Sequence, residues 1–170
     1  MNPNSLTIAN LVLSIVAAYV ISVGHFITGG VLVLVSGMFD LLDGAVARVT
    51  GRTSTFGALL DSVVDRVSEA AVLCGLAIWG YPQAGLLELS LIIAVLAGSF
   101  LVSYIRARAE GLGLQCHVGL FTRAERVIVL AIGLLVNQVL IALCVLAFFV
   151  TITVIQRLVF VRHQTRTRGD

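Results

Sequence analysis

The sequence predicts an all-α polytopic membrane protein with six transmembrane helices, and three observations support this fold class. First, 59% of the 170 residues are hydrophobic and only 12% are charged, a balance far from that of a soluble globular domain. Second, the apolar runs reach the length of about 20 residues that a helix needs to cross a hydrocarbon core of about 30 Å. Third, the basic residues all fall on one side of the spans that these runs define.

The six predicted spans follow one another with short connections. They cover residues 6–23, 27–49, 55–79, 85–108, 122–137 and 138–161. The start of the chain lacks a basic leading region and a small-residue cleavage site, so we expect the first span to be retained. The break between the last two spans falls at Asn137-Gln138. No repeat or long linker divides the chain, and residues 1–170 are predicted to form a single domain.

The distribution of charge predicts the orientation of the chain. Its 11 basic residues are all arginine, and on these spans they lie at one membrane side: Arg48, Arg52, Arg66, Arg106, Arg108, Arg123, Arg126, Arg157, Arg162, Arg166 and Arg168. The opposite connections, near residues 24–26, 80–84 and 137–138, carry none. Because arginine is retained on the cytoplasmic side, both termini are predicted to be cytoplasmic in a multi-pass protein of the cell membrane.

Acidic residues cluster in the stretch MFDLLDGAVARVTGRTSTFGALLDSVVDR, residues 38–66. Spacings of three and four residues place one group on a single face of the second span: Asp40, Asp43, Gly44 and Ala47. The same rule places another group on one face of the third span: Gly57, Asp61 and Asp65. Two neighbouring antiparallel helices can therefore bring four carboxylates together just inside the cytoplasmic boundary.

Four carboxylates so close together need a counter-charge. One interpretation is a salt network with the arginines of the same stretch: Arg48, Arg52 and Arg66. A salt network does not explain the glycines and the alanine on the same faces, although close helix packing would. A metal site explains the whole pattern better, because carboxylate oxygens suit Mg²⁺ or Mn²⁺, with substrate phosphates completing the shell.

The full spacing of these residues carries a family resemblance. The string Asp40-x-x-Asp43-Gly44-x-x-Ala47-Arg48, followed after residues 49–56 by Gly57-x-x-x-Asp61-x-x-x-Asp65, resembles the complete motif of the CDP-alcohol phosphatidyltransferases. The resemblance extends over nearly the whole chain and implies six transmembrane helices with the active site at the cytoplasmic side. It also implies the reaction, in which an acceptor hydroxyl attacks the lipid-side phosphorus of a CDP-linked lipid and CMP leaves.

The family pattern assigns roles to individual residues of this chain. It implies that two Mg²⁺ or Mn²⁺ ions are held by Asp40, Asp43, Asp61 and Asp65, and that Asp65 accepts the proton of the acceptor hydroxyl. It places the CDP-lipid beside a larger set: Pro3, Asn4, Ser5, Leu6, Gly44, Ala47, Arg48, Ser54 and Gly57. Ser54 stands where the family often has threonine, a departure that keeps the hydroxyl donor.

A second informative stretch is SYIRARAEGLGLQCHVGLFTRAERVIVL, residues 103–130. Arg106, Arg123 and Arg157 come from three different predicted helices at similar depth, and Ser103 shares a face with Arg106. Planar guanidinium groups make bidentate contacts with phosphate, so these residues could close on one anion. A phosphorylated acceptor would need such a pocket. Anchoring at the cytoplasmic surface remains the alternative interpretation, above all for Arg108 and Arg126.

The same arginines are similar to those of the phosphatidylinositol-phosphate synthase branch of the family, bacterial and archaeal. That resemblance implies inositol phosphate as acceptor, bound by Ser103, Arg106, Arg123 and Arg157. It also implies CDP-diacylglycerol or CDP-archaeol as donor, a homodimer, and no nucleic-acid partner. Phosphatidylglycerophosphate synthase, with glycerol 3-phosphate as acceptor, is the alternative enzyme. A non-catalytic cation-binding or transport protein is a remote alternative, because transport predicts polar residues throughout the membrane depth.

Overall fold

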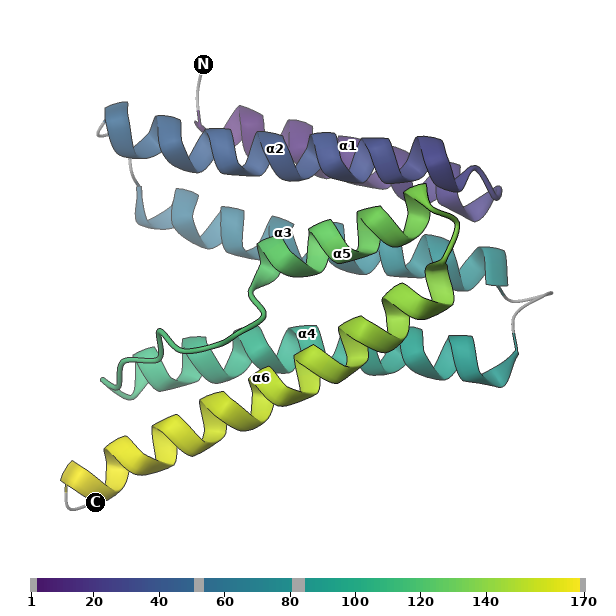
Figure 1. Ribbon diagram of the computed structural model, residues 1–170. Coiled ribbons are helices and arrows are strands. Elements are labelled where there is room, and N and C mark those ends of the chain that lie inside the picture. The colour runs from purple at the N-terminus through teal and green to yellow at the C-terminus, as the bar shows by residue number, and fades with distance from the viewer. Residues whose placement is uncertain (1–2, 51–53, 81–84, 169–170) are drawn as a thin grey trace.

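The computed structural model describes the backbone of residues 3–50, 54–80 and 85–168, and the side chains of residues 5–40, 54–80 and 85–166. Within these residues the chain forms six helices (Figure 1): α1 (Pro3–Ser22), α2 (Phe26–Thr50), α3 (Thr55–Gly80), α4 (Leu86–Gly111), α5 (Arg123–Leu135) and α6 (Val139–Arg168). The all-α prediction is confirmed. Most helix ends lie within a few residues of the predicted spans, whereas α6 continues to Arg168 instead of ending at residue 161.

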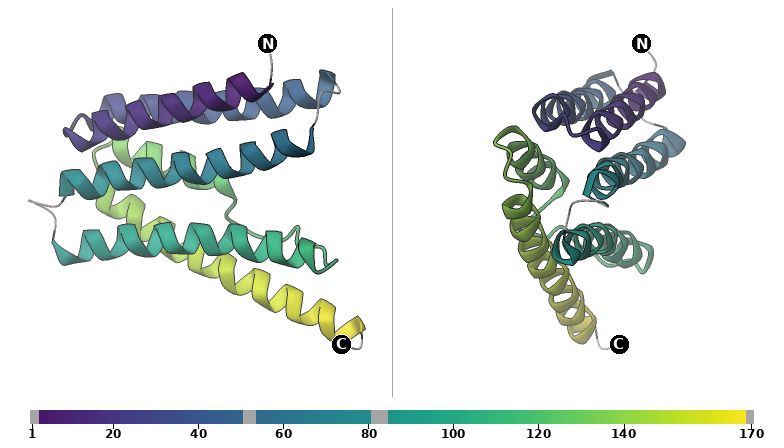
Figure 2. Two further views of the ribbon diagram at one scale, coloured as in Figure 1. Left: turned by 180° about the vertical axis from the view of Figure 1, so that it is seen from behind. Right: turned by 90° about the vertical axis from the view of Figure 1, so that its right-hand side faces the viewer.

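The helices close into a ring. Each packs mainly against two neighbours, in the order α1, α2, α5, α6, α4, α3 and back to α1, and the end-on view in Figure 2 shows this arrangement. Large buried side chains from α1, α3, α5 and α6 fill the interior: Ile21, Leu73, Leu76, Leu134, Leu143 and Leu146. Because α3 and α5 are not neighbours in the ring, they can meet only through side chains that reach across its interior.

Two local features fix the helices that carry the aspartates. A Cβ atom on Gly75 of α3 would lie 2.4 Å from the Ala18 carbonyl oxygen, so only glycine permits this approach of α1 and α3. Between α1 and α2, the buried Ser36 hydroxyl donates to the side-chain oxygen of Asn10 and lies 2.8 Å from the Ser14 hydroxyl. Ser36 precedes Asp40 by one helical turn, so this contact sets the position of Asp40.

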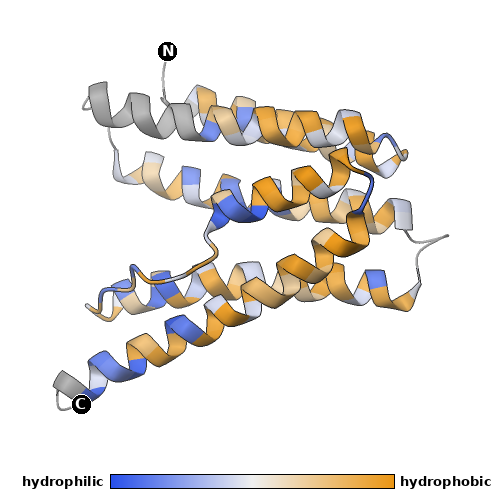
Figure 3. Ribbon diagram, in the orientation of Figure 1, coloured by the Kyte–Doolittle hydropathy of each residue, from blue (hydrophilic) through white to orange (hydrophobic). Residues whose placement is uncertain are grey.

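Hydrophilic residues gather at one end of the ring. Figure 3 shows them mostly where α3 and α5 begin and where α4 and α6 end. Among the described residues, three helices have the length and composition to cross a membrane, over Ser5–Ser22, Leu86–Gly111 and Val139–Arg166. With 13 residues, α5 is about 20 Å long, shorter than a hydrocarbon core. The crossing of the membrane by all six helices therefore stays a prediction.

Candidate active site

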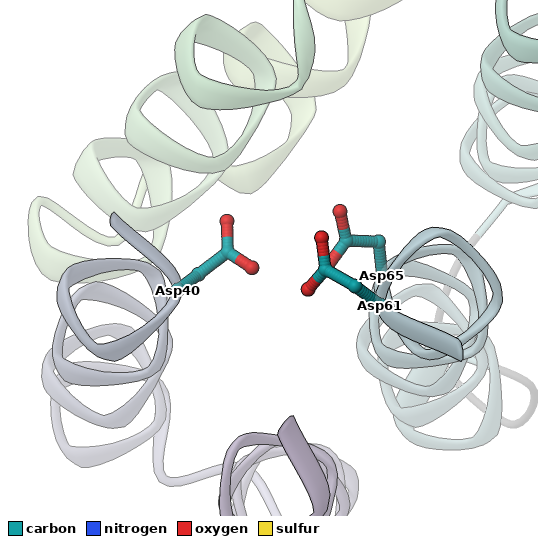
Figure 4. Close-up of side chains that lie close together, drawn as sticks. All are labelled: Asp40, Asp61 and Asp65. Atoms are coloured by element: carbon teal, nitrogen blue, oxygen red, sulfur yellow. The ribbon is translucent and has the colours of Figure 1, made fainter. Parts of the chain in front are cut away.

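Among the side chains that the structure describes, three carboxylates converge near the hydrophilic end of the ring. Asp40 projects from α2, whereas Asp61 and Asp65 project from successive turns of α3 (Figure 4). One oxygen from each carboxylate lies within 4.8 Å of the others, and all three side chains are partly buried. A set of hard oxygen donors at this separation fits Mg²⁺ or Mn²⁺.

Several predicted site residues lie outside the residues whose side chains are described. These are Pro3, Asn4, Asp43, Gly44, Ala47 and Arg48. The fourth predicted carboxylate and much of the predicted nucleotide contact therefore stay predictions. Of the arginines in the alternative salt network, Arg66 is described, and its guanidinium contacts the Ser62 carbonyl oxygen of its own helix.

Arg123 joins the aspartate cluster to a second region. It is the first residue of α5, where the Thr122 backbone N–H donates to the Glu125 carboxylate over 2.8 Å, as in a capping box. Its Nη1 lies 2.8 Å from Asp65 Oδ1 and also pairs with Asp40. Its Nε is buried and has no hydrogen-bond partner among the described residues. The aspartates therefore already pair with a cationic side chain, and the Nε donor of Arg123 is left to bind an anion.

A cavity of about 280 Å³ lies beside the aspartate cluster. Its wall contains all four residues predicted to bind the acceptor phosphate: Ser103, Arg106, Arg123 and Arg157. Asp65 lies in the same wall, so it belongs to both the carboxylate cluster and the arginine pocket. A small polyol phosphate held by the arginines would have its hydroxyl groups near this carboxylate.

The three predicted pocket arginines are held in different ways. Arg157 is 6% exposed, and its guanidinium donates to the Val118 carbonyl oxygen over 3.0 Å and to that of Val102. At Gly119, where φ is +148°, an added Cβ would lie 3.2 Å from Arg157 Nε. The connection between α4 and α5 therefore passes directly over this guanidinium. Arg106 is about half exposed and pairs with Glu110 over 2.9 Å. Arg157 is thus fixed, whereas Arg106 is open to solvent.

Two functional candidates were not among the predicted site residues. Glu69 and Arg126 also line the cavity and form a bidentate pair, with Arg126 Nε and Nη2 donating over 2.7 and 2.8 Å. Arg126 is 4% exposed, so it is buried in the bundle and does not anchor the protein at a surface. Helical spacing could have found both residues, because Glu69 follows Asp65 by one turn and Arg126 follows Arg123 by one turn.

Ser54 and Gly57, both predicted to border the nucleotide, contact each other at the start of α3. The Gly57 N–H donates to the Ser54 hydroxyl oxygen over 2.9 Å, which makes Ser54 the N-cap of the helix that carries Asp61 and Asp65. A hydroxyl can accept this bond and still donate its own hydrogen. Ser5 and Leu6 lie in the first turns of α1, exposed and half-buried respectively.

Comparison with known proteins identifies the family. The sequence profile of the CDP-alcohol phosphatidyltransferases matches residues 1–162. The chain is 39% identical to the archaetidylinositol phosphate synthase of Pyrococcus horikoshii, over 92% of this chain and 81% of that protein. It is 38% identical to the phosphatidylinositol phosphate synthase of Mycobacteroides abscessus, over 97% of this chain and 77% of that protein.

Solved structures resemble the fold closely. The phosphatidylinositol phosphate synthase of Mycobacterium tuberculosis with CDP-DAG bound superposes with a TM-score of 0.88 and 33% identity, covering 95% of this chain and 86% of that one. A second structure of that protein, in complex with manganese and citrate, gives a TM-score of 0.87 and 34% identity, covering 95% and 82%. The chain therefore belongs to the CDP-alcohol phosphatidyltransferase family and is a transferase enzyme.

Proposed function

We propose that this enzyme transfers a phosphatidyl or archaetidyl group from a CDP-linked lipid to a hydroxyl of inositol phosphate and releases CMP. The observation that carries the proposal is the arginine-lined cavity whose wall includes Asp65. Guanidinium groups recognise phosphate, so the cavity suits an acceptor that bears a phosphate of its own. The similarity to archaetidylinositol and phosphatidylinositol phosphate synthases supports inositol phosphate as that acceptor.

The aspartates would hold the metal. Asp40, Asp61 and Asp65 offer oxygens at suitable separations, and Asp43 completes the proposed set. When bound, two Mg²⁺ or Mn²⁺ ions would neutralise the pyrophosphate and stabilise the leaving CMP phosphate. The manganese complex of the mycobacterial synthase supports a divalent ion in this family.

The chain's own residues position the acceptor. Its phosphate binds Arg106, Arg123 and Arg157, and its hydroxyl then lies near Asp65. The hydroxyl oxygen forms a bond to the lipid-side phosphorus, the bond from that phosphorus to the CMP oxygen breaks, and the hydroxyl proton passes to Asp65. Because a metal-held carboxylate is a weak base, correct placement of the hydroxyl supplies much of the effect.

The CDP-lipid would lie on the other side of the aspartates. There it borders the N-terminal segment, the second half of α2 and the start of α3, at the following residues: Pro3, Asn4, Ser5, Leu6, Gly44, Ala47, Arg48, Ser54 and Gly57. The CDP-DAG complex of the mycobacterial synthase supports a CDP-lipid as donor. CDP-diacylglycerol and CDP-archaeol are both consistent with the relatives, which are bacterial and archaeal.

In the same proposal all six helices traverse the cell membrane, with both termini and the active site cytoplasmic and with two copies forming a homodimer. The gathering of hydrophilic residues at the site end of the ring (Figure 3) supports this orientation. It also disfavours a cation transporter, which would need polar groups along the whole membrane depth.

A CMP-release assay tests the proposal. Purified enzyme receives CDP-diacylglycerol and Mg²⁺, first alone, then with inositol phosphate, then with glycerol 3-phosphate. We expect CMP release with inositol phosphate. Glycerol 3-phosphate is the second candidate acceptor, since the arginines would bind its phosphate equally well, and release with it alone would reassign the acceptor. Release with neither acceptor would contradict the transferase activity proposed here.

A further inference from the structure

Two ion pairs connect α3 to α5 across the interior of the ring, one turn apart. The first joins Asp65 to Arg123, Oδ1 to Nη1, over 2.8 Å. The second joins Glu69 to Arg126 through two hydrogen bonds of 2.7 and 2.8 Å. The second pair has the fork geometry that fixes both the distance and the plane of a guanidinium group.

The position of α5 relative to Asp61 and Asp65, the two aspartates of α3, depends on these cross-ring contacts. By its backbone α5 packs against α2 and α6, and α3 is not its neighbour in the ring. The first turn of α5 carries both Arg123 and Arg126. Arg123 pairs with Asp65 and, in the proposed function, also binds the acceptor, so a second contact between α5 and α3 would hold its guanidinium in place.

The Glu69–Arg126 pair is suited to be that contact. Arg126 is 4% exposed and Glu69 10%, so little water competes for the two hydrogen bonds. Both residues line the 280 Å³ cavity, and both also border a second cavity of about 30 Å³ that contains Val72, Leu73 and Leu130. Together with Arg123, which also borders both cavities, the pair therefore lies between the arginine pocket and the more apolar interior.

The geometry points to Glu69 and Arg126 as positioning residues of the phosphorylated acceptor: they fix the first turn of α5 so that Arg123 meets the acceptor phosphate. This inference rests on the proposed function, because it concerns the acceptor side of the same site. It differs from a merely structural role in one respect. Loss of the pair should selectively weaken binding of the acceptor. Loss of structural support alone should lower stability or weaken binding of both substrates.

The main variant replaces both partners, Glu69→Met with Arg126→Met, since an apolar pair of similar volume can replace a buried ion pair without loss of folding. We expect a rise of about tenfold in the KM for the phosphorylated acceptor, because a small misplacement of a binding group is costly. The KM for the CDP-lipid should stay within about twofold of wild type. Calorimetric titration with inorganic phosphate, in detergent, should show a similar loss of affinity without any turnover.

A conservative variant and a control complete the design. Arg126→Lys keeps the charge but not the fork, so we expect a smaller rise in the acceptor KM, about threefold. Glu88→Gln removes an acidic residue from the first turn of α4, at the other end of the ring, and should leave both KM values unchanged. If the double variant does not fold, the acceptor KM and the phosphate affinity of Arg126→Lys decide whether the pair has the positioning role.

The outcomes separate this inference from the proposed function. If wild type turns over neither acceptor, the proposed function fails, and the phosphate titration still decides between the variants. If wild type is active but the variants keep its acceptor KM and its phosphate affinity, the positioning role is wrong. An equal rise in both KM values would also overturn it, because that result is expected from general distortion of the site.

Discussion

The aspartate cluster and the arginine pocket share Asp65 and Arg123, but the chain builds them differently. The aspartates come from two helices that follow each other directly, and two of them lie on successive turns of one helix. The pocket arginines come one each from α4, α5 and α6, so no two of them share a helix. Helical spacing therefore brings Asp61 and Asp65 together on α3, whereas Asp40 and each pocket arginine reach the site only through the packing of the whole bundle.

The largest effect is expected in the aspartate cluster. Asp61→Asn keeps the shape of the side chain but removes the charge of a proposed metal ligand, so we expect kcat to fall by about a thousandfold. Titration with Mn²⁺ should show weaker binding in the same variant. Activity close to wild type would contradict the metal role of the aspartates.

Arg123 tests how far the two regions are coupled. Arg123→Ala should raise the acceptor KM by about 10- to 100-fold, because it removes the charged hydrogen bonds that the proposed function assigns to Arg123 and the acceptor phosphate. The KM for the CDP-lipid should change little. The variant should also bind Mn²⁺ at lower concentration, since Arg123 pairs with Asp40 and Asp65, two of the proposed metal ligands. If the KM values for both substrates rise equally, the assignment of Arg123 to the acceptor is wrong.

A smaller effect is expected at Arg106, which is 52% exposed. Arg106→Ala should raise the acceptor KM by only about fivefold, because an exposed charge contributes about 1 kcal/mol. Added salt should reduce the difference between variant and wild type. Glu110→Gln removes the partner of Arg106 while keeping the arginine, and it serves as the control. If Arg106→Ala raises the acceptor KM as much as Arg123→Ala does, the smaller contribution expected of Arg106 is wrong.

These differences explain what could be predicted from the sequence. The six helices and the shared face of Asp61 and Asp65 follow from apolar run length and from a spacing of four residues. Asp40 does meet this pair, although α1 lies between α2 and α3 in the ring, so the two helices are not the direct neighbours that the sequence predicts. The ion pairs of Arg123 and Arg126 could not be predicted in that way, since their partners lie 57 residues or more away in the chain. Helical spacing indicates which side chains share a face. It does not indicate which helix the face meets.

The smallest predicted effect separates two roles of Ser54. Its hydroxyl caps α3, and in the proposed function it also contacts the CDP-lipid. Ser54→Ala should lower stability by about 1 kcal/mol, whereas Ser54→Gly should cost only a few tenths, because glycine is tolerated at an N-cap. Thermal unfolding in detergent measures this difference. If the hydroxyl also contacts the nucleotide, both variants should raise the KM for the CDP-lipid to the same extent, despite their different stabilities. If instead the KM is normal in Ser54→Gly and raised only in Ser54→Ala, it follows stability. Ser54 would then act only as the N-cap of α3 and would affect Asp61 and Asp65 through the start of their helix.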